Sequence, residues 1–458
     1  MLPSCWKKSI ITPIFKKGDR SSANNYRPIS LTSVVCKIME SIIKDSILSY
    51  LDKNKLLYSK QYGFMPKKST NAQLLRYFND ISSRVLDGCQ VDSVYLDYSK
   101  AFDSIVHEKL FFKLQQYGIN NKLLTWLTSF LVDREQTVRV GGSYSDWSSV
   151  LSGVPQGSVL GPILFIIYIN DLSSSCPDLH SLYLFADDAK CFASIRSSSD
   201  CLLFQNSLDS ISNWSNLWQL NLAADRCQII SFSYLKASIS YNYFVNAVPL
   251  IRVNEVVDLG VRFSQDLSFS PHIKDVCSRA RRKASIILNC FKSRNRMVLF
   301  KAFATFVRPL LDYCSNLWCP FRKSEIDLIE SVQRRVTKRL NGMTELQYSE
   351  RLTLLGTESL EKRRLTHDIC MYYKIIFELI VLPIDDFFCF RTGITRNNGL
   401  CIYQNSFRSN AERYYFKNRC IISWNLLPSY IVKSTSLNTF KRDLATIDLS
   451  KHLRTNYD

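Results

Sequence analysis

The sequence predicts an α+β fold that continues into a helical, basic region. Three observations predict this fold. Strand-like and helix-like stretches alternate as far as residue 263, and residues 272 to about 380 show mostly helical periodicity. Of the formal net charge of +19, residues 1–269 carry 27 basic and 23 acidic side chains and residues 270–458 carry 32 and 17, so the excess lies in the helical part.

Hydrophobic periodicity places the individual elements in order. We expect helices at 34–51, 104–117, 120–132, 158–172 and 200–221, strands at 92–98 and 227–233, hairpins at 136–150 and 180–193, and short β segments at 244–263. Turns or loops are expected at 21–28, 140–149 and 194–200. Asp103 is the expected N-cap of the helix that begins near Ser104.

Composition limits the class of protein. The chain of 458 residues is 46% hydrophobic and 22% charged, which is typical of a globular protein of about three domains. Its start lacks the apolar core of a signal peptide, and no apolar run is long enough to span a bilayer, so we expect a soluble intracellular protein without a membrane partner. The fifteen cysteines have no spacing typical of a zinc site or a disulfide framework, and most are expected to be buried thiols.

The basic excess is clustered. The clusters are Arg279, Arg281, Arg282 and Lys283; Arg334, Arg335, Lys338 and Arg339; and Lys362, Arg363 and Arg364. Around the first cluster, apolar residues recur at steps of three and four along the predicted helix. This spacing leaves Arg279, Arg282 and Lys283 on another face of that helix. A solvated face explains any single cluster, whereas three clusters in one region favour a polyanionic partner.

Two adjacent aspartates, Asp187 and Asp188, stand between the strand-like stretches "LYLFA" and "AKCFASI". Aspartate in a turn is ordinary, but in "DSVYLDYSKAFDSI" another carboxylate, Asp97, ends an apolar strand. Carboxylates from separate elements are the ligands that Mg²⁺ uses, and two such ions about 4 Å apart promote phosphoryl transfer. Between these elements, "LSGVPQGSVLGPILF" has glycines that permit close backbone approach, although a glycine-rich helix start is the commoner interpretation.

Several stretches in a fixed order resemble the reverse transcriptases of non-LTR retrotransposons, particularly the jockey-like group. They are "ITPIFKKGDRSSANNYRPISL", "QYGFMPKKST", "VYLDYSKAFDSI", "SGVPQGSVLGPILF", "LFADD", "DLGVRFSQDLSFSPHI" and "ISWNLLP". The resemblance implies a right-hand polymerase that has an RRM-like palm with an antiparallel sheet. Its expected parts are fingers (1–90), palm with inserted fingers elements (91–268), basic helical thumb (269–350) and a mostly helical C-terminal extension (351–458).

The resemblance also implies site residues. Asp97, Asp187 and Asp188 are the expected catalytic and metal-binding carboxylates, for two Mg²⁺ ions with Mn²⁺ as the alternative. Phe102 is expected to crowd the 2′ position of the incoming sugar; without the motif it would be interpreted as a core residue.

Further expected nucleotide-binding residues are Lys16, Lys17, Arg27, Gln156 and Gly157. The thumb residues expected to hold nucleic acid are Arg279, Arg282, Lys283, Arg334 and Arg335, and "DLGV" (258–261) is the expected primer-gripping hairpin. Residues 385–458 form either an RNA-binding surface or a packed helical domain.

The sequence departs from the family at two points. Ala223 and Arg226 stand where the family has asparagine and lysine, so Arg226 is the expected cation on the pyrophosphate side, although it hardly deprotonates. The expected endonuclease does not precede the fingers in this sequence. The leading hypothesis is an RNA-directed DNA polymerase that uses an RNA template, a DNA primer and deoxynucleoside triphosphates. The alternatives are a truncated, weakly active or inactive remnant that binds nucleic acid, and an RNA-dependent RNA polymerase. A nuclear location is implied only by the resemblance.

Overall fold

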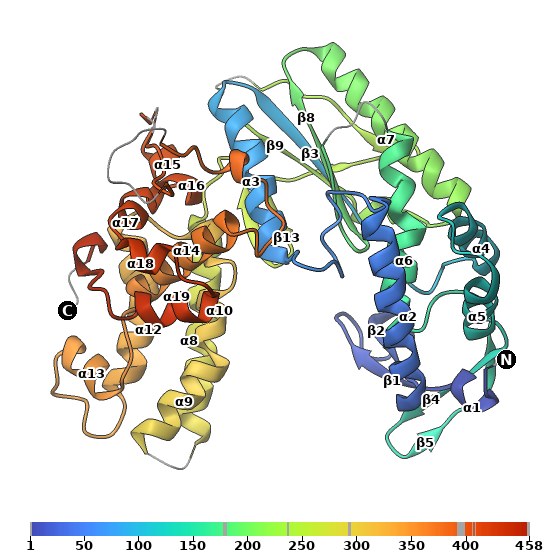
Figure 1. Cartoon of the computed structure of the whole chain (residues 1–458), viewed down its shortest axis with the longest axis horizontal. Coiled ribbons are helices and arrows are strands. Elements are labelled where there is room, and N and C mark those ends of the chain that lie inside the picture. The colour runs from blue at the N-terminus through green and yellow to red at the C-terminus, as the bar shows by residue number, and fades with distance from the viewer. Residues whose placement is uncertain are drawn as a thin grey trace. The chain divides into compact units, whose positions relative to one another are not determined.

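The computed structural model describes residues 2–176, 181–235, 238–291, 295–391, 399–404, 406–407 and 409–455. They form two compact units (Figure 1). The first comprises residues 1–66 and 84–253, and the second comprises residues 67–83 and 254–458. Helix α3 (Thr70–Leu86) crosses the boundary between them in the sequence.

The first unit contains helices and strands in alternation, which confirms the mixed α and β content. Its helices are α1 (Ser4–Lys7), α2 (Val34–Lys53), α4 (His107–Gln116), α5 (Asn121–Leu131), α6 (Gly161–Ile169) and α7 (Ser198–Trp218). Its strands are β1 (Lys8–Phe15), β2 (Tyr26–Leu31), β3 (Gln90–Leu96), β4 (Arg134–Val140), β5 (Ser143–Tyr144), β6 (Ser148–Val150), β7 (Leu182–Phe185), β8 (Asp188–Ile195), β9 (Gln228–Phe232), β10 (Phe244–Val245), β11 (Val248–Pro249) and β12 (Ile251–Arg252).

A five-stranded sheet in the order β12-β9-β3-β8-β7 forms the centre of this unit. β3 lies antiparallel to both β8 and β9, and most of its side chains are buried, as expected for a central strand. Helix α6, in which every residue except Pro162 is buried, belongs to the same core, and each fully buried aliphatic side chain contributes about 1.5–3 kcal/mol. Figure 1 shows β3, β8 and β9 side by side, with α7 running from the sheet toward α4.

A second sheet runs in the order β2-β1-β4-β5, with β6 also paired to β4. β1 and β2 form an antiparallel hairpin in which Ile14 is opposite Arg27. β1 also pairs in parallel with β4, which follows it by more than 100 residues in the sequence. Pairing with β4 therefore fixes the position of the β1–β2 hairpin in this sheet.

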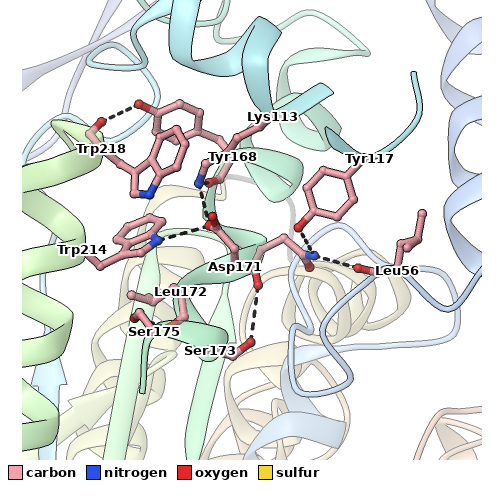
Figure 2. A network of polar contacts seen from close by, with 11 residues as sticks. Leu56, Lys113, Tyr117, Tyr168, Asp171, Leu172, Ser173, Ser175, Trp214 and Trp218 are labelled. Atoms are coloured by element: carbon pink, nitrogen blue, oxygen red, sulfur yellow. Dashed lines mark hydrogen bonds and ion pairs between the residues drawn. The ribbon is translucent and has the colours of Figure 1, made fainter. Parts of the chain in front are cut away.

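A partly buried ion pair, in which Lys113 is 3% and Asp171 35% exposed, joins α4 to the segment that follows α6 (Figure 2). The Lys113 ammonium lies 2.6 Å from Oδ1 of Asp171, and the rings of Trp218, Trp214 and Tyr168 surround it, with the nearest centroid, that of Trp218, at 3.7 Å. Burial lowers the pKa of Lys113 to about 8, while Asp171 acts in the opposite direction. The contact fixes the far end of α6, the helix that follows the "PQG" loop.

The second unit is mainly helical. Its strands are β13 (Glu255–Asp258) and β14 (Val261–Ser264), and its helices besides α3 are α8 (Ser270–Cys290), α9 (Arg296–Phe306), α10 (Arg308–Asp312), α11 (Ser315–Trp318), α12 (Lys323–Lys338), α13 (Tyr348–Leu354), α14 (Leu360–Ile376), α15 (Asn410–Arg413), α16 (Phe416–Arg419), α17 (Ile421–Asn425), α18 (Ser429–Val432) and α19 (Leu437–Leu444).

The C-terminal helices pack against α14 rather than standing apart. Arg419 donates to both oxygens of Asp368 at 2.7 and 2.8 Å, and its side chain is only 9% exposed. Trp424 is fully buried, with its ring 6.1 Å from that of Tyr372. Of the two interpretations of residues 385–458, these contacts favour the packed helical domain. Asn405 and Arg408 of this segment lie outside the described residues.

Most of the predicted elements are found within a few residues, and the differences are local. The helix expected from 104 begins only at His107, so the prediction that Asp103 is its N-cap is wrong. Residues 26–28 belong to β2 rather than to a loop. The hairpin expected at 180–193 is β7 and β8, and His180 lies outside the described residues.

All fifteen cysteines are free thiols, and eleven of them are buried. No helix in the described ranges is both long and apolar enough to cross a membrane.

Candidate active site

The three predicted carboxylates lie at one end of the central sheet. β3 ends immediately before Asp97, and its antiparallel register with β8 brings Asp97 opposite Asp188. Asp187 lies in the turn between β7 and β8, because Phe185 pairs directly with Asp188. The sheet therefore brings together two segments that are 90 residues apart in the sequence, where the sequence predicted a strand end and a hairpin turn.

The electrostatics of Asp187 show that this end of the sheet concentrates negative charge. Burial raises the pKa of Asp187, and the nearby Asp97 carboxylate raises it further. Lys16 and Arg27 act in the opposite direction. A cation bound beside Asp187 would be stabilised by the negative charge of both carboxylates.

The donor set fits a hard divalent cation. Magnesium at phosphate-processing sites takes one or two protein carboxylates and completes its shell with water and substrate phosphates. Among the described residues, no group of three or more His, Cys, Asp or Glu side chains converges closely enough to hold a metal by itself. Asp97 and Asp187 thus match a site that substrate completes, rather than a closed protein cage.

The two positions expected from the resemblance to depart from the family, Ala223 and Arg226, both contact Asp97. The backbone N–H of Ala223 donates to the carbonyl oxygen of Asp97 at 2.8 Å. Nη1 of Arg226, the last residue of a short 3₁₀ helix, lies 3.3 Å from Oδ2 of Asp97. The side chains of Arg226 and Asp97 are each more than 40% exposed, so this ion pair is accessible to solvent and weak. Arg226 contacts a predicted metal ligand directly.

The cations of the β1–β2 hairpin are exposed. Lys16 and Lys17 follow β1, and the N–H of Lys16 donates to the carbonyl oxygen of Asn25 at 2.8 Å across the loop. Arg27 lies on β2. Lys16 and Arg27 are near enough to Asp187 to lower its pKa, which places their charges at the carboxylate end of the sheet.

The "PQG" loop packs against the β1–β2 hairpin. Its Gln156 accepts from the N–H of Ser30 at 2.7 Å through the backbone oxygen, and its Nε2 donates to Oδ1 of Asp103 at 2.9 Å. Gly157 has a φ of +120°, and a Cβ there would lie 2.6 Å from the oxygen of Ser30. The glycine is needed for close contact within the chain, where the sequence had suggested contact with a substrate.

Phe102 has one face in the core and remains half-buried. Its ring stacks on Phe165 of α6 with centroids 4.5 Å apart, and Phe64 meets it edge to face at 6.3 Å. Phe64 itself is 55% exposed and adopts a positive φ of 57°. Phe102 therefore packs on the core, as its interpretation as a core residue requires, and is also partly exposed, as its interpretation as a sugar-contacting residue requires.

Sequence reasoning missed Glu40, which is fully buried. Its Oε2 accepts from the N–H groups of Val159 and Leu160 at 2.7 and 3.0 Å, so a side chain of α2 caps the start of α6. Gln61 and Gly63, in the "QYGF" stretch, were also missed as individual site residues. They lie beside the β7–β8 turn. Nothing in the local pattern marks these contacts, because each joins distant segments.

The predicted thumb residues differ in exposure within the second unit. Arg282, Lys283 and Arg335 are exposed on α8 and α12. Arg279 and Arg334 are half-buried and pair with Asp275 and Asp327, at 2.9 and 3.2 Å.

The third basic cluster turns inward. Arg364 is 1% exposed, and Arg363 donates to Asp312 at 2.8 Å. The expectation that this cluster faces a polyanion is therefore wrong for Arg364, while Arg363 is partly exposed and paired with an acidic residue.

The stretch "DLGV" forms the turn of the β13–β14 hairpin, also in the second unit. Asp258 pairs with Val261, and the two residues between them have positive φ values, 45° at Leu259 and 84° at Gly260. The hydroxyl of Tyr313 donates to the carbonyl oxygen of Leu259 at 2.8 Å, which holds the turn.

Parts of this chain match known proteins. Residues 14–263 match the family described as "Reverse transcriptase (RNA-dependent DNA polymerase)". Over 74% of its length the chain is 29% identical to the probable RNA-directed DNA polymerase from transposon X-element, and over 74% it is 28% identical to that from mobile element jockey, both of Drosophila melanogaster. The chain spans 38% of the length of each relative. Among solved structures, apo telomerase from Candida tropicalis has 12% identity and a TM-score of 0.46, over 79% of this chain and 61% of that one.

Proposed function

Because this chain belongs to the reverse transcriptase (RNA-dependent DNA polymerase) family, we propose that it extends the 3′-hydroxyl of a DNA primer on an RNA template with deoxynucleoside triphosphates. The relatives from the jockey and X-element transposons agree with the resemblance that the sequence motifs indicated. The observation that carries the proposal is that the sheet brings Asp97 beside the β7–β8 turn, where burial and the charge of Asp97 both raise the pKa of Asp187. Such a pair fits a cation-assisted transfer of a nucleotide.

Each site residue then has a task. Asp97 and Asp187 would hold Mg²⁺, with Asp188 beside them, and the metal supplies charge stabilisation for the attacking and leaving oxygens. Lys16 and Arg27 would bind the triphosphate, whose negative charge they neutralise. Lys17, Gln156 and Gly157 are assigned to the same nucleotide site.

The proposal also assigns regions. Residues 1–90 are the fingers, 91–268 the palm, 269–350 the thumb and 351–458 a C-terminal extension. Support for a nucleic-acid-binding thumb comes from the exposed Arg282, Lys283 and Arg335, since phosphate contacts from Lys and Arg supply most non-specific affinity.

Primer extension tests the function. A labelled DNA primer annealed to an RNA template is incubated with the protein, Mg²⁺ and the four deoxynucleoside triphosphates, and extension is measured on a denaturing gel. We expect extension that stops when EDTA removes the metal. The absence of any extension on RNA and on DNA templates, with intact binding of the template-primer, would contradict the proposal.

Phe102→Ala is expected to relax the choice of sugar. Its half-buried ring is proposed to occupy the space that a 2′-hydroxyl needs, and one apolar contact of this kind separates substrates by about 10- to 200-fold. The measurement is the ratio of kcat/KM for a deoxynucleotide and for the matching ribonucleotide. An unchanged ratio would return Phe102 to a purely structural role, and a wild-type preference for ribonucleotides would favour an RNA polymerase.

A non-catalytic remnant is the second candidate function. The observation that favours it is Arg226, which pairs with Asp97 and stands where a lysine is expected. Such a protein would bind the template-primer with salt-sensitive affinity and turn over poorly.

A further inference from the structure

We propose that Gln61 is a positioning residue for Asp187, and that the segment Lys60–Gly63 clamps the β7–β8 turn in the conformation that presents this carboxylate. The inference rests on the proposed function and deepens it, because it names what holds the metal-binding turn in place. Gln61 touches no reacting atom in this assignment and acts only through the turn.

The clamp begins with backbone pairing along β7. The N–H of Leu184 donates to the carbonyl oxygen of Lys60 at 3.1 Å, and the N–H of Tyr62 donates to the carbonyl oxygen of Leu184 at 2.8 Å. These two bonds make a parallel bridge between Gln61 and Leu184. The short segment thus adds a partner to the edge of the central sheet, immediately before the turn.

The side chain of Gln61 then reaches the turn itself. Its Oε1 accepts from the N–H of Ala186 at 3.0 Å and from the N–H of Gly63 at 2.8 Å. Gln61 and Ala186 are only 1% and 4% exposed, so water does not compete for these donors. A buried N–H left without its acceptor costs about 1–3 kcal/mol. Oε1 of Gln61 is therefore the acceptor that keeps the turn amide of Ala186 satisfied.

Ala186 needs such support because its conformation is strained. Its φ is +56°, in the left-handed region that residues with a Cβ rarely adopt. Strain of this kind costs about 1–3 kcal/mol and persists only where the surroundings enforce it. Ala186 directly precedes Asp187, so a change in its φ redirects the carboxylate.

Gly63 closes the clamp by direct backbone contact. A Cβ at this position would lie 2.3 Å from the nitrogen of Ala186 and 2.9 Å from the carbonyl carbon of Phe185. Gly63 has no positive φ, so the conflict with alanine is steric and not conformational. Because the opposing atoms are backbone, an added methyl group must displace the turn.

Two variants disturb the clamp in different ways. Gln61→Leu removes the acceptor and keeps the bulk, while Gly63→Ala keeps the acceptor and pushes the turn. Gly142→Ala is the matched control, since Gly142 also lacks a positive φ and its added Cβ would meet nothing within 4 Å.

Primer extension under varied Mg²⁺ separates positioning from general damage. We expect kcat to fall by about 100-fold in both clamp variants, the loss that a misplacement of about 1 Å causes, and the Mg²⁺ concentration for half-maximal rate to rise. The KM for deoxynucleotide and the Kd for the template-primer should stay at the wild-type values, and Gly142→Ala should match wild type throughout. The proposal would be overturned if KM and Kd rose by as large a factor as kcat fell, or if both clamp variants kept the wild-type kcat.

Hydrogen exchange tests the clamp independently of activity. In Gln61→Leu, the peptide that contains Ala186 should exchange faster than in wild type, while peptides from α7 should not change. If the wild-type protein does not extend a primer, the proposed function is wrong, and hydrogen exchange still tests the clamp. Unchanged exchange of the Ala186 peptide in Gln61→Leu would overturn the clamp.

Discussion

An Asp187→Asn variant is expected to lose primer extension by about 100- to 1000-fold while keeping its affinity for the template-primer. The amide removes one anionic ligand from the pair that faces the metal, and removing a single electrostatic group from a reacting centre costs up to roughly that factor. Template-primer affinity should persist, because the exposed cations of α8 and α12 are unchanged. The measurement pairs single-turnover extension with a binding titration at fixed salt.

The control is Asp146→Asn, an exposed aspartate in the loop between β5 and β6. It should extend primers like wild type. Wild-type extension by Asp187→Asn would refute the assignment of the β7–β8 turn. Asp97→Asn should show the same loss, with the added effect that Arg226 no longer pairs with an anion.

The same Asp187→Asn change is expected to stabilise the metal-free protein at neutral pH. A carboxyl whose pKa is raised by folding supports the fold below its unfolded pKa, and this support is lost as pH rises through the folded pKa. The amide has no such loss, so its melting temperature without Mg²⁺ should exceed that of wild type at neutral pH. We expect this gain in melting temperature to disappear in acid, where the wild-type carboxyl is also uncharged.

Arg226→Lys is expected to raise kcat for extension by about 10- to 100-fold. An arginine hardly gives up its proton, whereas a lysine can protonate a leaving pyrophosphate as a general acid. The shorter point charge of lysine also makes a less directional contact with Asp97 than the guanidinium at 3.3 Å does. The measurement is the pre-steady-state rate of single-nucleotide addition as a function of pH.

The control for this change is Arg226→Gln, which removes the charge and should fall below wild type if Arg226 still stabilises the product. A rate that is equal in Arg226→Lys and wild type would show that the residue at position 226 transfers no proton to the leaving pyrophosphate. A lysine variant that restores activity to an inactive wild type would favour the remnant as the present state of this protein.

The sequence predicted those parts of the site that depend on local patterns. The apolar pattern predicted a strand that ends at Asp97 and a hairpin at Asp187, and the family resemblance implied that these carboxylates share one site; the antiparallel pairing of β3 with β8 brings them together. The parallel pairing of β1 with β4 was not expected, since no local signal names a partner so far along the chain.

Other features were missed because a distant contact overrode a local preference. Asp103 has the position of an N-cap, yet its carboxylate accepts from Gln156, 53 residues away. Oε1 of Gln61 serves one donor 2 residues away and another 125 residues away, and only the first is near in sequence. The cluster of basic residues at 362–364 predicted that Arg364 lies on a basic surface, but the packing of α14 buries its side chain.

The Arg419–Asp368 pair has a practical consequence for dissecting the chain. A version cut after residue 400 would leave the Asp368 carboxylate, which is 2% exposed, without its guanidinium partner inside the protein. Breaking a buried pair in this way costs about 3–5 kcal/mol, a large part of the stability of a typical domain. Loss of activity on such shortening would therefore report unfolding of the helical unit, and point substitutions on its surface are the sounder way to look for an RNA-contacting face.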